Sequence, residues 1–324
     1  MAQSQLLVSL PPEEEISTAI TRHLVRIPWE YVGPSTPGPW PEARAMLVGD
    51  PGREIPGWTF AQTPRLEFVQ RLWTGLDRFP FARFPPSVRV SGNVGAFAPA
   101  VGEHAVTLLL ALAQDVRGDH ERVREGQLGA VGRRREIRGS TLLLLGFGEI
   151  ATEVAQRLKP FGVRIEGVVR STRAHPLVER MFPASSLREA VRGADLIVDC
   201  RPLTLATKGT IDEALLRSMK PKAIYVNVGR AATVDEEALF RHLSTHPEFR
   251  AGMDVWWEEE HTRDRIHHRF PFPELPNFLG SPHNAAESAD TGARGLSFAI
   301  DNLARFFSGE TPRHVANRRD YVSE

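Results

Sequence analysis

Hydrophobic and polar residues recur with a changing period along this chain, and the period predicts its secondary structure. From residue 140 onward, short apolar runs rich in β-branched residues alternate with stretches of helical period. The runs are typical of buried strands, and the periodic stretches are typical of amphipathic helices. Strands that alternate with helices predict a parallel sheet with helices on both faces. The predicted strands are 141–145, 163–169, 195–200, 223–228 and 251–255, and the predicted helices are 150–158, 186–192, 212–219, 236–242 and 285–307.

The first hundred residues follow a looser version of the same pattern. Apolar runs at 6–10, 44–48 and 66–72 are separated by stretches rich in Pro and Gly, which predicts a small α/β unit. A long helix is predicted from residue 99 to about 125, apolar at its start and strongly charged at its end. The helix at 285–307 is explained most simply by a chain that returns to its first domain. The predicted domains are therefore 1–100 plus 286–324, and 101–285.

Composition argues against several classes of function. The 40 basic residues balance 40 acidic ones, so charge gives no reason to expect nucleic acid or an anionic membrane as a partner. The longest apolar stretches fall well below the ~20 residues that cross a bilayer, and the N-terminus lacks the basic flank of a signal peptide. A single cysteine, Cys200, cannot form an internal disulfide or a Cys-rich metal site. We expect a cytoplasmic protein without a metal centre.

The most informative local motif is LLLLGFGEIA at residues 142–151. Gly146 and Gly148 directly follow a predicted strand and precede a predicted helix. That context is required for a dinucleotide-binding turn, in which the first glycine makes the tight turn and the second admits the pyrophosphate. The pyrophosphate then lies at the helix N-terminus, where backbone N–H groups are unpaired. Ala151 occupies the third, small position, so the motif predicts a dinucleotide cofactor.

The end of the second strand indicates which nicotinamide cofactor binds. An acidic residue about 20 positions beyond the glycines would bind the ribose hydroxyls of NAD, whereas arginine suits the 2′-phosphate of NADP. The chain has Arg170, Ser171, Thr172 and Arg173 at this point and no carboxylate. Two guanidinium groups and two hydroxyls can bind a phosphate through charge-assisted hydrogen bonds. The sequence therefore favours NADP(H) over NAD(H), although these arginines could also be ordinary solvated residues.

Further segments carry a family resemblance. These are PLTLATKGTI at 202–211, VNVGRAATVDEEAL at 226–239, AGMDVWWEEE at 251–260 and GSPHNAAES at 280–288. With the glycine turn, they resemble the D-isomer-specific 2-hydroxyacid dehydrogenases, which include glyoxylate/hydroxypyruvate reductases, from about residue 66 to 307. The resemblance implies two Rossmann/flavodoxin-like domains with a ligand cleft between them, of which 101–285 binds the dinucleotide and the discontinuous domain binds substrate. It also implies a homodimer.

The resemblance assigns three catalytic residues. Arg230 would pair with the substrate carboxylate and polarise the keto oxygen, for which a planar, permanently charged group is suited. His283 would act as the acid/base group. Glu259 would hold the imidazole and favour its protonated form. The implied reaction is hydride transfer between NADP(H) and C2 of a small 2-keto/2-hydroxy acid, and the individual acid stays open.

The resemblance also completes the predicted binding residues. Asp254 would contact the nicotinamide amide. Thr74 and Gly75 would bind the substrate carboxylate through their backbone N–H groups, and Gly75 would allow close approach. The full predicted cofactor set is Gly146, Phe147, Gly148, Glu149, Ile150, Arg170, Ser171, Arg173, Arg201, Pro202, Val228 and Asp254.

The chain departs from the family pattern at a few positions. Ala231 replaces the usual glycine, and Glu260 replaces the usual proline, so a one-residue slip would move the role of Glu259 to Glu258 or Glu260. Trp73, Trp256 and Trp257 are either core residues or part of the substrate pocket. His104 is interpreted as a structural residue. The histidines His261, His267 and His268 match no recognised ligand pattern, which favours a solvated loop. The alternative functions are a cofactor-sensing, corepressor-like binding protein and the oxidation of a one-carbon acid such as formate.

Overall fold

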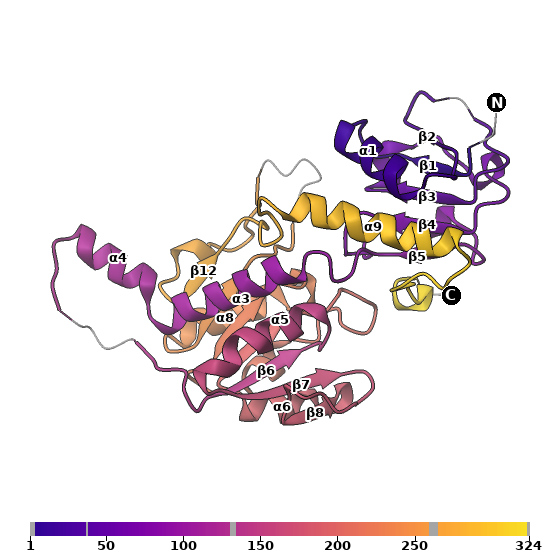
Figure 1. Cartoon of the computed structure of the whole chain (residues 1–324). Coiled ribbons are helices and arrows are strands. Elements are labelled where there is room, and N and C mark those ends of the chain that lie inside the picture. The colour runs from indigo at the N-terminus through magenta and orange to yellow at the C-terminus, as the bar shows by residue number, and fades with distance from the viewer. Residues whose placement is uncertain (1–3, 37, 130–133, 259–264, 323–324) are drawn as a thin grey trace. The chain divides into compact units, whose positions relative to one another are not determined.

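A computed structural model describes residues 4–36, 38–129, 134–258 and 265–322 of the chain (Figure 1). The chain forms two compact units, one of Met1–Phe97 with Ser288–Glu324 and one of Ala98–Glu287. Each unit is built on a sheet whose paired strands are all parallel. The predicted α/β class with two parallel-sheet domains is therefore confirmed.

The first unit has a five-stranded sheet in the order β2-β1-β3-β4-β5. This order is that of the flavodoxin-like doubly wound fold. The C-terminal helix α9 belongs to this unit although it lies nearly 200 residues beyond β5 in the sequence. The elements are β1 (Leu6–Val8), α1 (Glu14–His23), β2 (Trp29–Tyr31), β3 (Ala45–Val48), α2 (Pro51–Glu54), β4 (Phe68–Arg71), β5 (Arg89–Ser91) and α9 (Thr291–Phe307).

Side chains alternate between the two faces of the first sheet, as the period of a strand requires. Leu6 and Val8 pack in one core cluster with residues of α1 and α9, whereas Leu7 packs in a second cluster with aromatic residues of the connecting segments. Figure 1 shows α9 running along this sheet. The return of the chain therefore supplies one of the helices that cover the first sheet.

The second unit has a seven-stranded sheet in the order β12-β11-β10-β9-β6-β7-β8. Counted from β6, this is the Rossmann order 3-2-1-4-5-6 with one further strand beyond the sixth. The strands are β6 (Thr141–Leu145), β7 (Arg164–Val169), β8 (Arg180–Pro183), β9 (Leu196–Asp199), β10 (Ile224–Asn227), β11 (Arg250–Met253) and β12 (Phe278–Gly280). The helices are α3 (Ala98–Ala113), α4 (Val116–Arg124), α5 (Glu149–Leu158), α6 (Leu187–Gly193), α7 (Glu213–Leu216) and α8 (Glu236–Thr245).

Both faces of the second sheet are covered by helices. Leu143 and Leu145 of β6 share a core cluster with buried residues of α6, α7 and α8. On the other face, α3 lies against β10 and β11 and packs along α5. All five residues of β6 are buried, which explains why this strand is a run of leucines without polar alternation. Among the described residues, no helix is both long and apolar enough to cross a membrane.

The structure corrects one predicted helix and contains strands that the sequence did not predict. The predicted continuous helix from 99 to about 125 is wrong, because α3 ends at Ala113 and α4 begins at Val116. Asp115 lies between them in the left-handed region, with φ of 53°. Its position coincides with the change from an apolar to a charged sequence, beyond which α4 buries no residue. The strands β2, β5, β8 and β12 were not predicted; each is short, at three or four residues.

One buried histidine couples the stability of the second unit to pH. His242 of α8 is 8% exposed, stacks on His246 with ring centroids 4.2 Å apart, and meets Phe249 edge-on at 4.6 Å. Burial, followed by the effects of His246 and Arg217, lowers the pKa of His242 to about 4. The folded protein therefore holds this ring neutral at pH values where the unfolded chain protonates it.

We expect the free energy of unfolding to fall as the pH is lowered from about 6.5, the ordinary histidine pKa, towards 4. The unfolded state binds the additional proton in this window, so the stabilisation is complete above pH 6.5 and is lost towards pH 4. In His242→Gln, the same decrease should be shallower. Urea unfolding at a series of pH values measures both curves, and parallel curves for the two proteins would contradict the assignment.

Candidate active site

The predicted site residues of the second unit follow the strands of its sheet. The glycine turn follows β6, Arg170 follows β7, and Arg201 follows β9. Arg230, Asp254 and His283 follow the adjacent strands β10, β11 and β12 in the same way. Because the strands are parallel, these segments all lie at the carboxyl edge of one sheet. Ligands of open α/β sheets bind at this edge.

The glycine turn has the backbone that a dinucleotide requires. Gly146 has φ of +80°, a left-handed conformation, and a Cβ here would lie 2.9 Å from Cγ of Arg201. Gly148 differs, because a Cβ here would meet no atom within 4 Å. Gly148 is also the N-cap of α5, and no side chain caps this helix. No side chain therefore bonds the first N–H groups of α5, which leaves them available to a pyrophosphate.

The segment after β7 carries positive charge at the predicted adenosine end. Arg170, Ser171 and Arg173 are exposed, and the described segment from 170 to 178 contains no carboxylate. Phe147 of the glycine turn packs on His175 of this segment, with ring centroids 4.7 Å apart. The phenylalanine is only 7% exposed, so its side chain supports the turn from within.

Hydrogen bonds fix the backbone on which Arg230 sits. Asn227 Oδ1 accepts from Gly229 N at 3.0 Å, and its Nδ2 donates to Arg230 O at 3.1 Å. The Thr233 hydroxyl lies 2.9 Å from Arg230 O. The Arg230 Nη1 donates to Gly229 O at 2.8 Å. Arg230 itself is half-buried, which leaves part of its surface open to a ligand.

A buried ion pair lies beside this turn. Asp199 is fully buried and accepts from Nε and Nη2 of Arg201 at 2.9 and 2.6 Å. Arg201 Nη1 donates to Thr210 Oγ1 at 2.9 Å. Burial opposes the charge on Arg201, but Asp199 offsets it and holds the pKa of the guanidinium above its ordinary value. Burial also raises the pKa of the neighbouring Cys200 thiol, which makes it a poor nucleophile.

The turn that carries His283 is held by a buried carboxylate. Asp254 is 1% exposed and accepts from Ser281 Oγ at 2.6 Å, Asn284 N at 3.1 Å and Ala285 N at 3.0 Å. His104 Nε2 lies 2.8 Å from Ser281 Oγ. His283 is exposed and has φ of +55°, an unusual conformation for a non-glycine residue. The bonds to Asp254 hold the Ser281 side chain before this residue and the backbone of Asn284 and Ala285 after it.

The two tryptophans after Asp254 support the same edge from inside. Trp256 is 7% exposed, and its Nε1 donates to Ser281 O at 2.9 Å. Trp257 Nε1 donates to Val234 O at 2.8 Å, and its ring stacks on Phe272. His268 packs edge-on against Trp256. Both indoles thus have packing roles, which agrees with the core interpretation of these residues.

The predicted substrate loop lies in the first unit, after β4. Thr74 Oγ1 donates to Asn93 O at 3.0 Å, and Arg71 Nη1 donates to Gly75 O. Trp73 precedes them, stacks on Phe97 at 5.8 Å and is 44% exposed. The loop is therefore anchored by its side chains and carbonyls. Its role in substrate binding remains a prediction.

Comparison with known proteins identifies the family. The model of the D-isomer specific 2-hydroxyacid dehydrogenase NAD binding domain matches residues 106–285. The glyoxylate reductase of Aeropyrum pernix is 32% identical over 267 residues, covering 80% of this chain and 78% of that protein. The chain belongs to the D-isomer-specific 2-hydroxyacid dehydrogenases. It is thus an oxidoreductase that depends on a nicotinamide cofactor, as the motifs predicted.

Other relatives of this dehydrogenase agree with the assignment. The hydroxypyruvate reductase of Thermotoga maritima is 32% identical over 231 residues, covering 71% of this chain and 74% of that protein. The crystal structure of a candidate formate dehydrogenase from Pyrobaculum aerophilum is 29% identical, has a TM-score of 0.83, and matches 98% of this chain and 100% of that one. Neither the family nor these relatives supports the alternative of a corepressor-like binding protein.

Some predicted residues of the dehydrogenase lie outside the described part of the chain. These are Glu259, the predicted partner of His283, together with Glu260 and His261. Glu258, the last described residue before them, is exposed. Within the described ranges, no group of three or more His, Cys, Asp or Glu residues could hold a metal ion.

Sequence reasoning did not find the residues that support the dehydrogenase site. Asp199, Thr233 and Ser281 were not assigned a role, and His104 was taken as structural. Asn227 was also missed; it ends a buried strand, where a polar residue in an otherwise apolar run is the available signal. Only the geometry reveals what each of them contacts.

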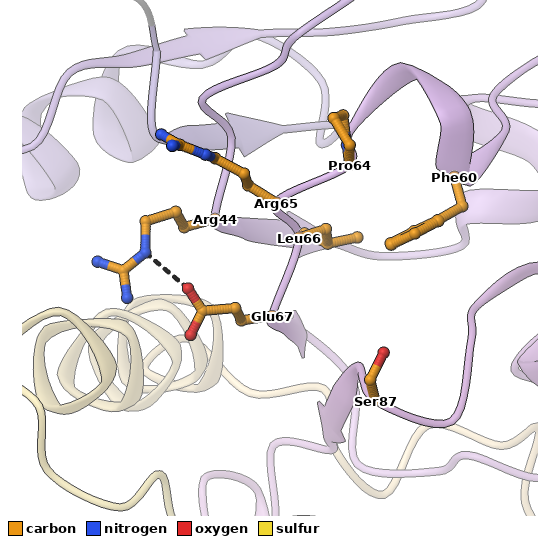
Figure 2. Close-up of a pocket in the computed structure, with 7 residues that line it drawn as sticks. All are labelled: Arg44, Phe60, Pro64, Arg65, Leu66, Glu67 and Ser87. Atoms are coloured by element: carbon orange, nitrogen blue, oxygen red, sulfur yellow. Dashed lines mark hydrogen bonds and ion pairs between the residues drawn. The ribbon is translucent and has the colours of Figure 1, made fainter.

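The hollow shown in Figure 2 is separate from these residues. It has a volume of about 410 Å³ and lies in the first unit, where Arg44 precedes β3 and Glu67 precedes β4. These two residues form an ion pair of 2.8 Å. They mark the amino ends of the strands, whereas Thr74 and Gly75 follow a carboxyl end. The hollow therefore lies at the wrong edge of its sheet for the predicted substrate loop.

We expect Gly148→Ala to weaken cofactor binding without unfolding the dehydrogenase. The added methyl meets no protein atom but occupies the space through which a pyrophosphate must approach. The Kd for the reduced cofactor, measured by fluorescence titration, should rise about tenfold or more, equal to about 1.4 kcal/mol. The Tm should change by less than about 3 °C.

Gly193→Ala is the matched control, because a Cβ at the end of α6 also meets no atom within 4 Å. It should leave both the Kd and the Tm close to those of the unmodified protein. An unchanged Kd in Gly148→Ala would show that the cofactor does not approach this turn.

Proposed function

We propose that this dehydrogenase reduces a small 2-keto acid of the glyoxylate and hydroxypyruvate class to the D-2-hydroxy acid with NADPH. The observation that carries the proposal is the succession of Arg230, Asp254 and His283 after three adjacent strands, at the edge that also bears the glycine turn. We assign cofactor binding to the second unit and substrate binding to the first. The relatives named glyoxylate reductase and hydroxypyruvate reductase support this substrate class.

Arg230 is proposed to bind the substrate. Its guanidinium is planar and permanently charged, so it can pair with the carboxylate and polarise the adjacent keto oxygen. Asn227 and Thr233 hold the carbonyl of the same residue, which restricts the direction in which the side chain leaves the backbone. Orientation of this kind contributes to catalysis because the reacting atoms meet in a productive geometry. Thr74 and Gly75 are proposed to bind the same carboxylate through backbone N–H groups.

His283 is proposed to exchange the proton. A reduced nicotinamide, when bound, would supply the hydride that C2 of the keto acid accepts. His283 would donate a proton to the keto oxygen, so that a hydroxyl forms. Asp254 accepts hydrogen bonds from Ser281, Asn284 and Ala285. These bonds hold the turn that carries His283, and they thereby restrict where its exposed ring can lie. Glu259 is proposed as the carboxylate that stabilises the protonated ring.

Oxidation of formate is a second candidate, supported by the similarity to the formate dehydrogenase candidate of Pyrobaculum aerophilum. The glutamate at 259 argues against it, since a carboxylate partner serves a histidine that must donate a proton. The proposal also retains a homodimer formed through the second unit, which sedimentation equilibrium can test, and a cytoplasmic location, which cell fractionation can test.

The first test follows the absorbance of reduced nicotinamide with glyoxylate, hydroxypyruvate, pyruvate and phenylpyruvate, and with formate in the oxidative direction. We expect turnover on the keto acids. Arg230→Lys should lower kcat/KM by about 10²-fold, because a point charge replaces a bidentate group. His283→Gln should lower kcat by about 10²–10⁴-fold.

Arg241→Lys, on the exposed face of α8, is the matched control for loss of a guanidinium and should keep full activity. Wild-type activity in Arg230→Lys or His283→Gln would refute the proposed roles. Formate oxidation without keto-acid reduction would favour the second candidate, and cofactor binding without any turnover would refute the enzymatic proposal.

The preference for NADPH is tested by Arg170→Ser/Arg173→Ser. Loss of both guanidinium groups should raise the KM for NADPH by about 10–100-fold and leave the KM for NADH within about threefold, because only NADPH carries the 2′-phosphate. Arg188→Ser, on the exposed side of α6, serves as the control. An equal rise in KM for NADPH and NADH would show that these arginines do not bind the 2′-phosphate.

A further inference from the structure

Asp199 and Arg201 form a buried ion pair at the end of β9, and the stability of the fold does not require charges there. Asp199 ends β9, and both side chains are almost completely buried. Replacing such a pair by well-packed apolar residues is often neutral or stabilising, since burial removes the hydration of both charges. Stability alone therefore does not account for the pair. The hydrogen bonds that the pair makes to neighbouring residues suggest a different role.

The hydrogen bonds of the pair lead to the Arg230 turn. The Thr233 hydroxyl lies 3.1 Å from Asp199 Oδ2 and 2.9 Å from Arg230 O, so it can donate to either. Asn227 Nδ2 also donates to Arg230 O. The Tyr225 hydroxyl donates to Asp199 Oδ2 at 3.3 Å. A single hydroxyl thus lies within hydrogen-bond distance of both the buried carboxylate and the carbonyl of the proposed substrate-binding residue, and its one proton can go to either acceptor.

The backbone of Arg201 separates two functional turns. A Cβ on Gly229 would lie 2.4 Å from Arg201 O, and a Cβ on Gly146 would lie 2.9 Å from Arg201 Cγ. The Arg230 turn therefore packs on one part of Arg201, and the cofactor turn packs on another. Asp199 Oδ1 also accepts from Arg201 N at 3.1 Å, which fixes the backbone between them.

We propose that Asp199 and Arg201 are positioning residues that hold the Arg230 turn at a set distance from the glycine turn of the cofactor site. This inference rests on the proposed role of Arg230 in binding the substrate carboxylate. The guanidinium of Arg201 bonds Asp199 and Thr210, so in this proposal it acts through these residues. This role replaces the cofactor contact that the family resemblance predicted for Arg201. Loss of the pair therefore affects keto-acid binding and turnover more than cofactor affinity.

The test compares four variants. Asp199→Leu/Arg201→Met removes both charges together and retains the Arg201 methylenes that pack on Gly146. Thr233→Val removes the hydroxyl link and leaves the ion pair intact, which keeps the proposal testable if the double variant does not fold. Asp199→Asn leaves an uncompensated guanidinium and should lower the Tm by roughly 10 °C.

Asp195→Asn is the matched control at the opposite end of β9. Asp195 accepts from Thr141 N at 2.9 Å and Lys220 Nζ at 3.0 Å, and it forms an ion pair with Arg135 at 3.2 Å. Its replacement removes a comparable ionic network far from the carboxyl edge of the sheet. We expect a lower Tm and an unchanged KM for the keto acid.

The readouts are the KM and kcat for the keto acid, the Kd for NADPH, and amide hydrogen exchange in peptides covering residues 227–234. In the double variant and in Thr233→Val, we expect KM to rise about tenfold or more and kcat to fall. The Kd for NADPH should stay within about threefold, and amides of 227–234 should exchange faster than those of the control.

A double variant with unchanged KM, kcat and exchange would overturn the proposal, since the pair would then be structural only. A Kd for NADPH that rises in step with KM would also overturn it, because the pair would then act on the cofactor. If the unmodified protein turns over no keto acid, the proposed function fails, and hydrogen exchange in 227–234 still decides whether the pair orders this turn.

Discussion

The parallel direction of the strands in the second unit is the constraint on which the site depends. A parallel pair needs a long crossover, so every strand of this sheet must end at the same edge before the chain returns. Gly146, Arg230 and His283 are far apart in the sequence, yet they share an edge for this reason alone. The apolar strand interiors make this arrangement stable, and the first residues beyond each strand are free to carry chemistry. Residues within the strands therefore stabilise the fold, and residues just beyond the strands carry the proposed function.

A cost of this arrangement is that polar groups gather at the edge of a buried sheet. The turns after β10 and β12 contain backbone groups that no strand pairing can satisfy. Asn227 meets this need for the Arg230 turn, and Asp254 meets it for the His283 turn. Each is a buried polar residue at the end of an apolar strand. Polar residues at these positions thus both complete the fold and orient the exposed side chains beyond them.

The sequence predicted the main elements of the second unit because its signals are local. The leucine run before Gly146 and the alternation of strands and helices each depend on neighbouring residues only. The break at Asp115 was missed because helical period continues on both sides of it, and the turn depends on a single backbone conformation. Short strands such as β12 lack enough residues to show a period, and they form by pairing with strands that come earlier in the chain.

The candidate site was predictable to the extent that family motifs mark individual residues. Arg230, Asp254 and His283 were predicted in this way, whereas the contacts of Asp199 with Tyr225 and Thr233 depend on how β9 pairs with β10. No local pattern encodes that pairing. The tryptophans at 256 and 257 show the same limit, since composition alone could not distinguish a core residue from a pocket residue.

The raised pKa of the Cys200 thiol has a practical consequence. It is the only cysteine of the chain, it is half-buried just beyond β9, and desolvation raises the pKa of its thiol, which disfavours the thiolate. Thiol-directed reagents require a thiolate that they can reach. A cysteine introduced at a fully exposed position should therefore react faster with such reagents than Cys200. Fluorescent or spin labels could be attached there without first removing a native residue, so the natural chain already provides the background that such spectroscopy needs.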